Sequence, residues 1–215
     1  MSTPQARPGT DTPATVQFDH FSIAASATTL ERLGFRVTPT PGTQGRHGRV
    51  FLDGVYVEIR EPHEPPGATT SNAWFLRTGD VHRCAQQLRA RGLTARGPHR
   101  YEAADGAWLD LELEVGDLGA VLPVITQRVS PAAGPWPPAL TEPQPNGTCA
   151  VRELHLTTSD PYALGRVLRT LGATAGEDGF LTFERHVRVV VKRGVDGIAG
   201  VVFATDAQDD LRLDL

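Results

Sequence analysis

Two ionisable side chains, His20 and Glu58, could form one chemical site. Each lies in a short apolar run that is typical of a β-strand, residues 18–24 and residues 55–59. Successive side chains of a strand point to opposite faces of a sheet, so the apolar residues of each run would face the core and the two ionisable ones would face a cleft. An imidazole and a carboxylate in one cleft can exchange protons with a ligand or bind a divalent metal ion. We therefore predict His20 and Glu58 as the catalytic pair and as the candidate metal ligands.

Other polar side chains follow the same alternation toward the predicted cleft. Ser22 is two residues from the imidazole, and Tyr56 is two residues from the carboxylate. Arg77, near the end of a later apolar strand, could clamp a carboxylate or phosphate, or it could extend into solvent at the strand end. We predict that these three residues contact a ligand. Asp110, which alternates with apolar residues on another strand, is interpreted as part of a solvated face.

The elements that would position these residues repeat along the chain. A short apolar strand, an amphipathic helix that ends at glycine, and three further strands occur in succession. The helices are predicted to end at Gly34, Gly92 and Gly172, because glycine is favoured just after a helix. Each copy is therefore a βαβββ module. The sequence predicts an α+β fold in which curved mixed sheets enclose a cleft and the helices cover the outer face.

The repeats also predict how the chain is divided. The parts are a disordered tail at 1–15, paired modules at 16–128 (16–60 and 72–128), a proline-rich linker at 129–149, and a third module with a partial fourth at 150–215. The fourth module would stop after its first strand. That truncation would leave a sheet edge that a second chain could cover, so we expect a homodimer.

The unit that opens with Asp19-His20 and closes with Tyr56-Val57-Glu58-Ile59, followed by a second such unit, resembles the vicinal-oxygen-chelate superfamily. This superfamily includes glyoxalase I, extradiol dioxygenases and bleomycin- and fosfomycin-resistance proteins. The resemblance covers nearly the whole chain after residue 15. The turn Gln144-Pro145-Asn146-Gly147 is similar to the His-Pro-Asn-Gly turn of the glyoxalase-like domain branch, from which Gln144 departs. The resemblance implies a small polar metabolite as ligand.

Metal-using members of this superfamily take their ligands from the first and last strands of two paired modules. The resemblance therefore implies a divalent ion (Mn, Fe, Ni or Zn) on His20 and Glu58, or no cofactor where the ligand set is incomplete. When the second module is laid on the first, an alanine lies opposite His20 and Gln127 lies near the place of Glu58. His155 would compensate if the third module pairs with the first, although Glu153 is the direct counterpart of His20. Gln127 and His155 are thus predicted to contact the ligand.

Two functions fit these residues. A glyoxalase-like enzyme, of lyase, isomerase or dioxygenase type, would use His20 and Glu58 on a small polar metabolite. A non-catalytic binder of the bleomycin-resistance type would use the same cleft with an aromatic wall of Trp74, Tyr56 or Trp136. The presence of a stoichiometric metal ion would favour the enzyme.

Composition argues against several other partners. The formal net charge is −4 and no block of like charge occurs, so nucleic acid and anionic membranes are not expected as partners. No stretch approaches the roughly 20 apolar residues of a membrane span. The residues at the beginning of the chain do not form a secretory signal, and Cys84 and Cys149 lack any metal or redox motif. A cytoplasmic protein is the expectation.

Overall fold

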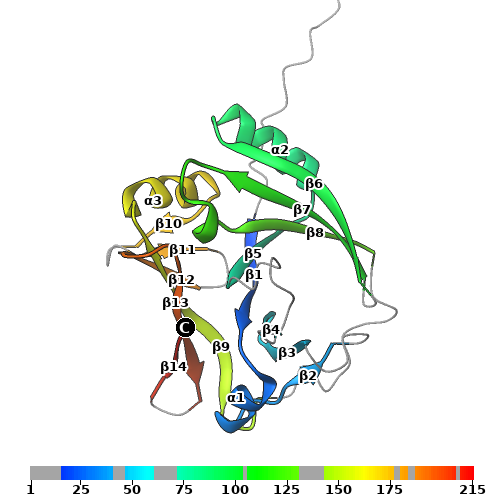
Figure 1. The fold of residues 1–215 in the computed structure, drawn as a ribbon, viewed down its shortest axis with the longest axis vertical. Helices are drawn as coiled ribbons and strands as arrows, with labels where there is room; N and C mark the ends of the chain where they lie inside the picture. Colours follow the sequence, from blue (N-terminus) through cyan, green and yellow to red (C-terminus); the bar gives the residue numbers. More distant parts are fainter. Residues whose placement is uncertain are drawn as a thin grey trace, which may run out of the picture.

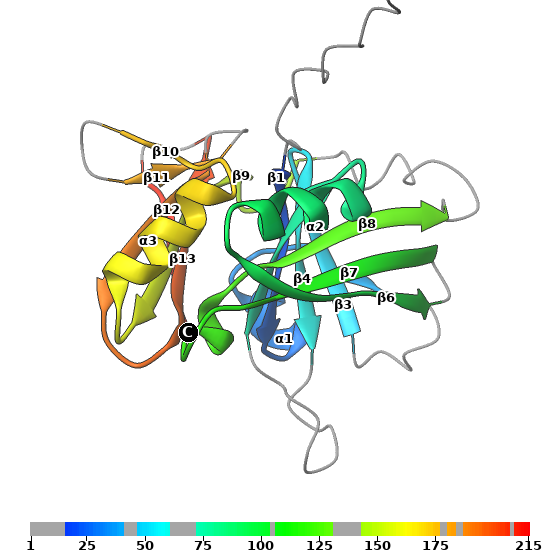
Figure 2. The same ribbon diagram turned by 90° about the horizontal axis from the view of Figure 1, so that it is seen from above.

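The computed structural model describes residues 16–40, 47–60, 72–103, 106–130, 143–176, 180–183, 187–206 and 209–215. The predicted tail and residues 131–142 of the predicted linker, which include Trp136, lie outside the described residues. Within the described part of the chain, two curved mixed sheets lie against each other (Figures 1 and 2). None of the helices described there is long and apolar enough to cross a membrane.

The first sheet has the strand order β2-β3-β4-β1-β5-β8-β7-β6. Its strands are β1 (Val16–Ala24), β2 (Thr38–Pro39), β3 (His47–Leu52), β4 (Val55–Arg60), β5 (Ala73–Thr78), β6 (Thr94–Ala103), β7 (Gly106–Glu114) and β8 (Val124–Ser130). Strand β1 lies between β4, to which it is parallel, and β5, to which it is antiparallel. The first and second modules therefore pair through β1 and β5.

The second sheet has the order β10-β11-β12-β9-β13-β14. Its strands are β9 (Thr148–Thr158), β10 (Thr174–Ala175), β11 (Leu181–Thr182), β12 (Arg188–Arg193), β13 (Gly197–Thr205) and β14 (Leu211–Asp214). Strand β9 repeats the pattern of β1, since it is parallel to β12 and antiparallel to β13. The chain does not end its regular structure at β13, because β14 continues as an antiparallel edge strand. The α+β fold of βαβββ modules is confirmed.

The helices are α1 (Ala27–Arg32), α2 (Val81–Ala90) and α3 (Pro161–Thr170), with the short 3₁₀ helix η1 (Gly119–Val121). Asp80 and Asp160 cap α2 and α3 by accepting hydrogen bonds from backbone N–H groups three residues later. The predicted helix ends are confirmed: Gly34, Gly92 and Gly172 have φ angles of 81°, 80° and 103°. These angles lie in the left-handed region, where glycine avoids the steric cost of a Cβ atom.

The two sheets share one apolar core. Phe203 of β13 packs against Phe21 of β1 and against Phe35, with ring centroids 6.3 and 5.2 Å apart. Trp74 of β5 packs edge-on against Phe183, at 6.1 Å. The faces of the two sheets that carry these aromatic residues therefore look toward each other. The opposite face of each sheet carries the polar residues.

Trp74 does not line a cleft, contrary to the prediction of an aromatic wall. Its side chain is 1% exposed, and its Nε1–H donates a hydrogen bond to the carbonyl oxygen of Val121 at 2.9 Å. The physical reason is strand alternation, which places Trp74 and Leu76 on the core side of β5 and leaves Phe75 on the other side.

Replacing Phe203 with alanine is expected to destabilise both sheets together. The side chain is 1% exposed, and its removal leaves a cavity between the sheets, which costs about 3–5 kcal/mol of unfolding free energy. Urea denaturation measures the loss. The control Tyr162→Ala, at a residue that is 72% exposed, should change stability by less than about 0.5 kcal/mol. A loss below about 1 kcal/mol for Phe203→Ala would contradict the shared core.

Candidate functional site

The inner face of the first sheet is its polar face, opposite the side that packs into the shared core. A β-bulge in β1 determines which side chains reach this inner face. Phe18 pairs with Leu76 whereas His20 pairs with Phe75, so Asp19 is an extra residue on β1. Phe18 therefore stays on the core side, where it is fully buried. The bulge also brings Asp19 beside the next residue, with its Oδ2 atom 2.8 Å from Nδ1 of His20.

His20 lies in a ladder of stacked rings. Its imidazole is sandwiched between Tyr56 on β4 and Phe75 on β5, with centroid distances of 4.3 and 4.0 Å and interplanar angles of 11° and 9°. Phe51 on β3 continues the ladder, with its ring centroid 5.8 Å from that of Tyr56. The rings stack along the direction that joins neighbouring strands, so their edges face the inner side of the sheet. This packing fixes the plane of the imidazole.

Only one nitrogen of His20 is engaged by the described residues. Nδ1 pairs with Asp19, and no residue in the described ranges bonds to Nε2. A carboxylate at Nδ1 favours the neutral tautomer that carries its hydrogen there, and Nε2 then keeps its lone pair. His20 is 7% exposed. The geometry thus presents one basic nitrogen in a fixed orientation.

Glu58 is surrounded by groups that stabilise its charge. Oε2 accepts hydrogen bonds from Ser22 Oγ at 2.7 Å and from Arg60 Nη2 and Nε at 2.7 and 3.1 Å. Arg49 Nη2 lies 3.9 Å from Oε1. Burial acts to raise the pKa of Glu58, but the charge of Arg60, the Ser22 hydrogen bond and the charge of His20 outweigh burial and lower this pKa to about 2. Glu58 is therefore ionised at neutral pH.

The sequence correctly placed His20, Ser22, Tyr56 and Glu58 on one face, but it did not foresee their partners. Ser22 and Glu58 are register partners on β1 and β4, and Tyr56 is the register partner of His20. His20 and Glu58 nevertheless do not bond each other, because Asp19 engages the first and the groups around Glu58 engage the second. His20 and Glu58 therefore do not form an acid–base pair that exchanges a proton directly.

The described side chains around His20 and Glu58 do not fit a resident divalent metal ion. Within the described ranges, no three His, Cys, Asp or Glu side chains cluster so that they could hold a metal. Oε2 of Glu58 already accepts from Ser22 and Arg60, and an ion bound there would face the nearby guanidinium charge. The structure thus gives His20 and Glu58 other partners than the predicted metal.

Arg77 lies on the inner face, as its register requires, and it is held by a neighbour. Its Nε and Nη2 atoms donate to Oε1 of Gln17, at 3.0 and 2.7 Å. Gln17 and Arg77 are register partners on β1 and β5. Arg77 is half-buried and does not extend fully into solvent. Its contact with a ligand stays a prediction.

Gln127 does not reach the cleft, contrary to the prediction. Its Oε1 accepts from the backbone N–H of Val81, and its Nε2 donates to the carbonyl oxygen of Gly79, both at 2.9 Å. The side chain thereby caps the start of α2 on the core side of β8. The reason is again alternation, which gives the inner face to Thr126 and Arg128.

His155 also lies away from the site, because the third module forms its own sheet. His155 Nε2 is 2.8 Å from Oε2 of Glu153, which forms an ion pair with Arg188. The neighbours Leu154 and Leu156 are fully buried on the core side of β9. The two sheets meet through their core sides, so the polar face of β9 and the polar face of β1 lie on opposite sides of the shared core. The idea that His155 completes the His20 site is wrong.

Asp110 belongs to the inner face, although the sequence suggested solvent. Thr126 Oγ1 donates to its Oδ1 at 2.6 Å. Burial raises the pKa of Asp110, against the Thr126 hydrogen bond and the charges of His20 and Arg60. Arg60 lies on β4, four strands away, which is roughly 19 Å along a flat sheet. The two charges interact because the sheet curls, and Figures 1 and 2 show β6–β8 running in a different direction from β3 and β4.

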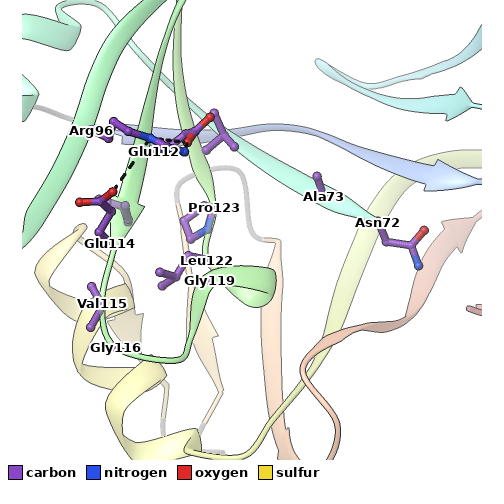
Figure 3. Close-up of a pocket in the computed structure, with 12 residues that line it drawn as sticks. Asn72, Ala73, Arg96, Glu112, Glu114, Val115, Gly116, Gly119, Leu122 and Pro123 are labelled. Atoms are coloured by element: carbon purple, nitrogen blue, oxygen red, sulfur yellow. Dashed lines mark hydrogen bonds and ion pairs between the residues drawn. The ribbon is translucent and has the colours of Figure 1, made fainter. Parts of the chain in front are cut away.

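A pocket of about 530 Å³ continues the inner face toward the ends of β7 and β8. Ala73 in its wall is the register partner of Ser22, and Val124 is the register partner of Phe75, so the pocket adjoins the ring ladder. Figure 3 shows Arg96 paired with Glu112 on one side of the pocket and Asn72 on the other. The wall consists of Asn72, Ala73, Arg96, Glu112, Leu113, Glu114, Val115, Gly116, Gly119, Leu122, Pro123 and Val124. A volume of this size suits a small organic ligand.

No protein-family model matches this sequence, and no curated protein matches it. Solved structures do match in fold. A hypothetical protein from Staphylococcus aureus matches with a TM-score of 0.65 at 10% identity, over 90% of this chain and 93% of that chain. Homoprotocatechuate 2,3-dioxygenase from Arthrobacter globiformis matches with a TM-score of 0.54 at 14% identity, over 94% of this chain and 67% of that one.

The Mn(II)-bound glyoxalase from Novosphingobium aromaticivorans matches with a TM-score of 0.53 at 10% identity, over 92% of this chain and 67% of that chain. The protein thus has the fold of the vicinal-oxygen-chelate proteins, and the resemblance seen in the sequence is confirmed for the fold. Identities of this size show a shared architecture, and a shared architecture does not by itself define an activity.

The charge of Glu58 should make stability depend on acid pH. Its folded pKa of about 2 lies below the ordinary value of 4.5, so ionised Glu58 contributes roughly 3 kcal/mol above pH 4.5, and this contribution is lost as the pH falls toward 2. Glu58→Gln should lower the unfolding free energy at pH 7 by an amount of that order, and the difference from wild type should shrink at low pH. Urea denaturation across this pH range measures both. Glu102→Gln, in an exposed ion pair with Arg100, should cost at most about 1 kcal/mol; an equal effect of the two substitutions would contradict the assignment.

Asp19 should set the tautomer of His20. In wild type the neutral imidazole should carry its hydrogen on Nδ1, and Asp19→Asn should shift the population toward the Nε2–H form, because an amide no longer demands a donor at Nδ1. Two-bond ¹⁵N–¹H NMR correlations of the neutral ring report the tautomer. Exposed His82 provides the internal reference, since it should not change. An Nε2–H tautomer for His20 in wild type would refute the pairing.

Proposed function

We propose that the inner face of the first sheet binds a small, oxygen-rich anion, such as a carboxylate-bearing metabolite, and that His20 exchanges a proton with this ligand. The observation that supports the proposal most strongly is the state of the imidazole. Asp19 holds Nδ1, two aromatic rings hold the plane, and within the described ranges Nε2 has no protein partner. A preorganised basic nitrogen in a cleft is the arrangement that general acid–base chemistry requires.

The surroundings of His20 favour an anionic ligand. The ring edges of Phe51, Tyr56 and Phe75 face the inner side, and the edge of an aromatic ring is the positive end of its quadrupole. Arg60 and Arg49 lie next to this ladder, and their guanidinium groups lie 2.7 and 3.9 Å from the Glu58 carboxylate. Guanidinium groups bind carboxylates through paired hydrogen bonds.

The proposal does not route the chemistry through a metal on Glu58. Among the solved structures of this fold, the glyoxalase from Novosphingobium aromaticivorans holds Mn(II). In this chain, however, Oε2 of Glu58 accepts from Ser22 and Arg60, and Arg49 lies near Oε1. Arginine and histidine side chains would supply here the positive charge and the proton acceptor that the reaction needs.

A binding protein without turnover is the second candidate. The observation that favours it is the internal pairing of the inner face: Glu58 pairs with Arg60, and Arg77 pairs with Gln17. Such pairs stabilise a preformed cavity whether or not a reaction follows. The same cleft and the same ligand class serve both candidates, and they differ in whether His20 must transfer a proton.

Ligand binding can be tested with four probes: pyruvate, oxalate, homoprotocatechuate and the neutral compound catechol. The carboxylates should raise the melting temperature and bind in calorimetry, and catechol should bind at least about 10-fold more weakly. EDTA should have no effect on binding. His20→Ala should weaken carboxylate binding by about 10-fold, whereas His82→Ala, at an exposed histidine of α2, should not change it.

The results that oppose the proposal are specific. Equal binding by wild type and His20→Ala, or binding of none of the carboxylates, would show that the site is wrong. Binding that needs added Mn²⁺ and disappears in Glu58→Gln would restore the metal hypothesis. A carboxylate that binds and is chemically changed, as followed by NMR, favours the enzyme, and binding without change favours the second candidate.

A further inference from the structure

Asp110 on β7 holds a position that the proposed chemistry has not yet used. The adjacent Leu111 is fully buried on the core side, so the carboxyl group of Asp110 points to the inner face. The residue is half-buried there. Thr126 Oγ1 donates to Oδ1 at 2.6 Å, and no residue in the described ranges bonds to Oδ2. Thr126 therefore holds one carboxyl oxygen, and the other makes no hydrogen bond with the described residues.

Several charged and titratable groups face Asp110 from the neighbouring strands. Arg77 on β5 and His99 on β6 are in the same row of the sheet, and Glu112 follows on β7 itself. His20 on β1 and Arg60 on β4 act on Asp110 across the curl of the sheet. Asp110 and His20 thus lie on the same face of one curved sheet, with β5 and β8 between their strands.

From this geometry we infer that Asp110 is a second ligand-contacting residue, which in its protonated form donates a hydrogen bond from Oδ2 to an acceptor oxygen of the ligand. This inference rests on the proposed function, because it assigns a second contact to the same site. It also narrows the ligand class to anions with a hydroxyl group at one end and an acceptor oxygen at the other, such as a hydroxy acid or a hydroxylated aromatic acid. The lone pair on Nε2 of His20 would accept from the hydroxyl group, and Asp110 would donate to the acceptor oxygen.

The protonated form is favoured on two grounds. Burial raises the pKa of the Asp110 carboxyl above its ordinary range. A bound anion would add a negative charge nearby, which disfavours a second carboxylate and promotes proton uptake by Asp110. Because the donor is present below the pKa of Asp110 and is lost above it, the affinity for an anion should fall as the pH rises through that pKa.

Two substitutions at one position separate the hydrogen bond from the charge. Asp110→Asn keeps a donor, since its amide N–H can replace the carboxylic O–H at every pH, whereas Asp110→Ala removes the donor. Calorimetric titration with homoprotocatechuate from pH 4.5 to 8 should show that Asp110→Asn loses the decline of affinity that wild type shows. Asp110→Ala should bind about 10-fold more weakly at the low end of this range. Exposed Asp117→Asn should behave as wild type.

The failure of this inference is distinguishable from that of the proposed function. If wild type binds none of the probes at any pH, the proposed function falls and this inference with it. If wild type binds them but Asp110→Asn keeps the wild-type pH profile, or Asp110→Ala binds as tightly as wild type, the role of Asp110 alone is refuted. Circular dichroism and melting temperature of each variant establish that the fold is intact, and the Asp110→Asn arm decides the matter if Asp110→Ala does not fold.

Discussion

The buried negative charge of Glu58 constrains the first sheet more than any other feature. A carboxylate that is removed from water needs compensating charge and hydrogen bonds, because its desolvation otherwise costs several kcal/mol. The compensation comes from three strands: Ser22 on β1, Arg60 on β4 and Arg49 on β3. These groups meet only if the three strands keep their register. The same interactions place two guanidinium groups beside the carboxylate, where a metal ion would meet their positive charge. The groups that stabilise Glu58 therefore also determine which chemistry is available around it.

The first and third modules share one architecture but carry different polar side chains. Strands β1 and β9 each carry an irregularity in register and each lie between a parallel and an antiparallel neighbour. On β1 the inner face presents a histidine whose second nitrogen is open. On β9 the corresponding face presents Glu153 and His155, and Glu153 pairs with both His155 and Arg188 of the neighbouring strand β12. A repeated fold therefore does not repeat its chemistry. For the same reason, a shared fold at low sequence identity to solved structures does not define the chemistry of this chain.

The curvature of the first sheet brings the polar residues of β7 toward the ring ladder around His20. In a flat sheet the ring ladder around His20 and the polar residues of β7 would be far apart, and each would face solvent. Because the sheet curls, Asp110 and Arg60 influence each other, and a pocket opens beside the ladder. The shared core with the second sheet supports this shape from the outside, through contacts such as Phe203 with Phe21. Packing on one face thus maintains the cleft on the other.

The sequence alone determined the βαβββ modules, the helix ends at glycine, and the common face of His20, Ser22 and Glu58. These features follow from local rules, namely strand alternation, helical periodicity and the freedom of glycine at positive φ. Only the tertiary structure decided that β1 pairs with β5, that the bulge brings Asp19 to His20, and that the sheet curls toward Asp110. Register, bulges and curvature depend on contacts between residues far apart in the chain. Local patterns fix the face on which a side chain lies, but they do not fix which side chains of that face meet.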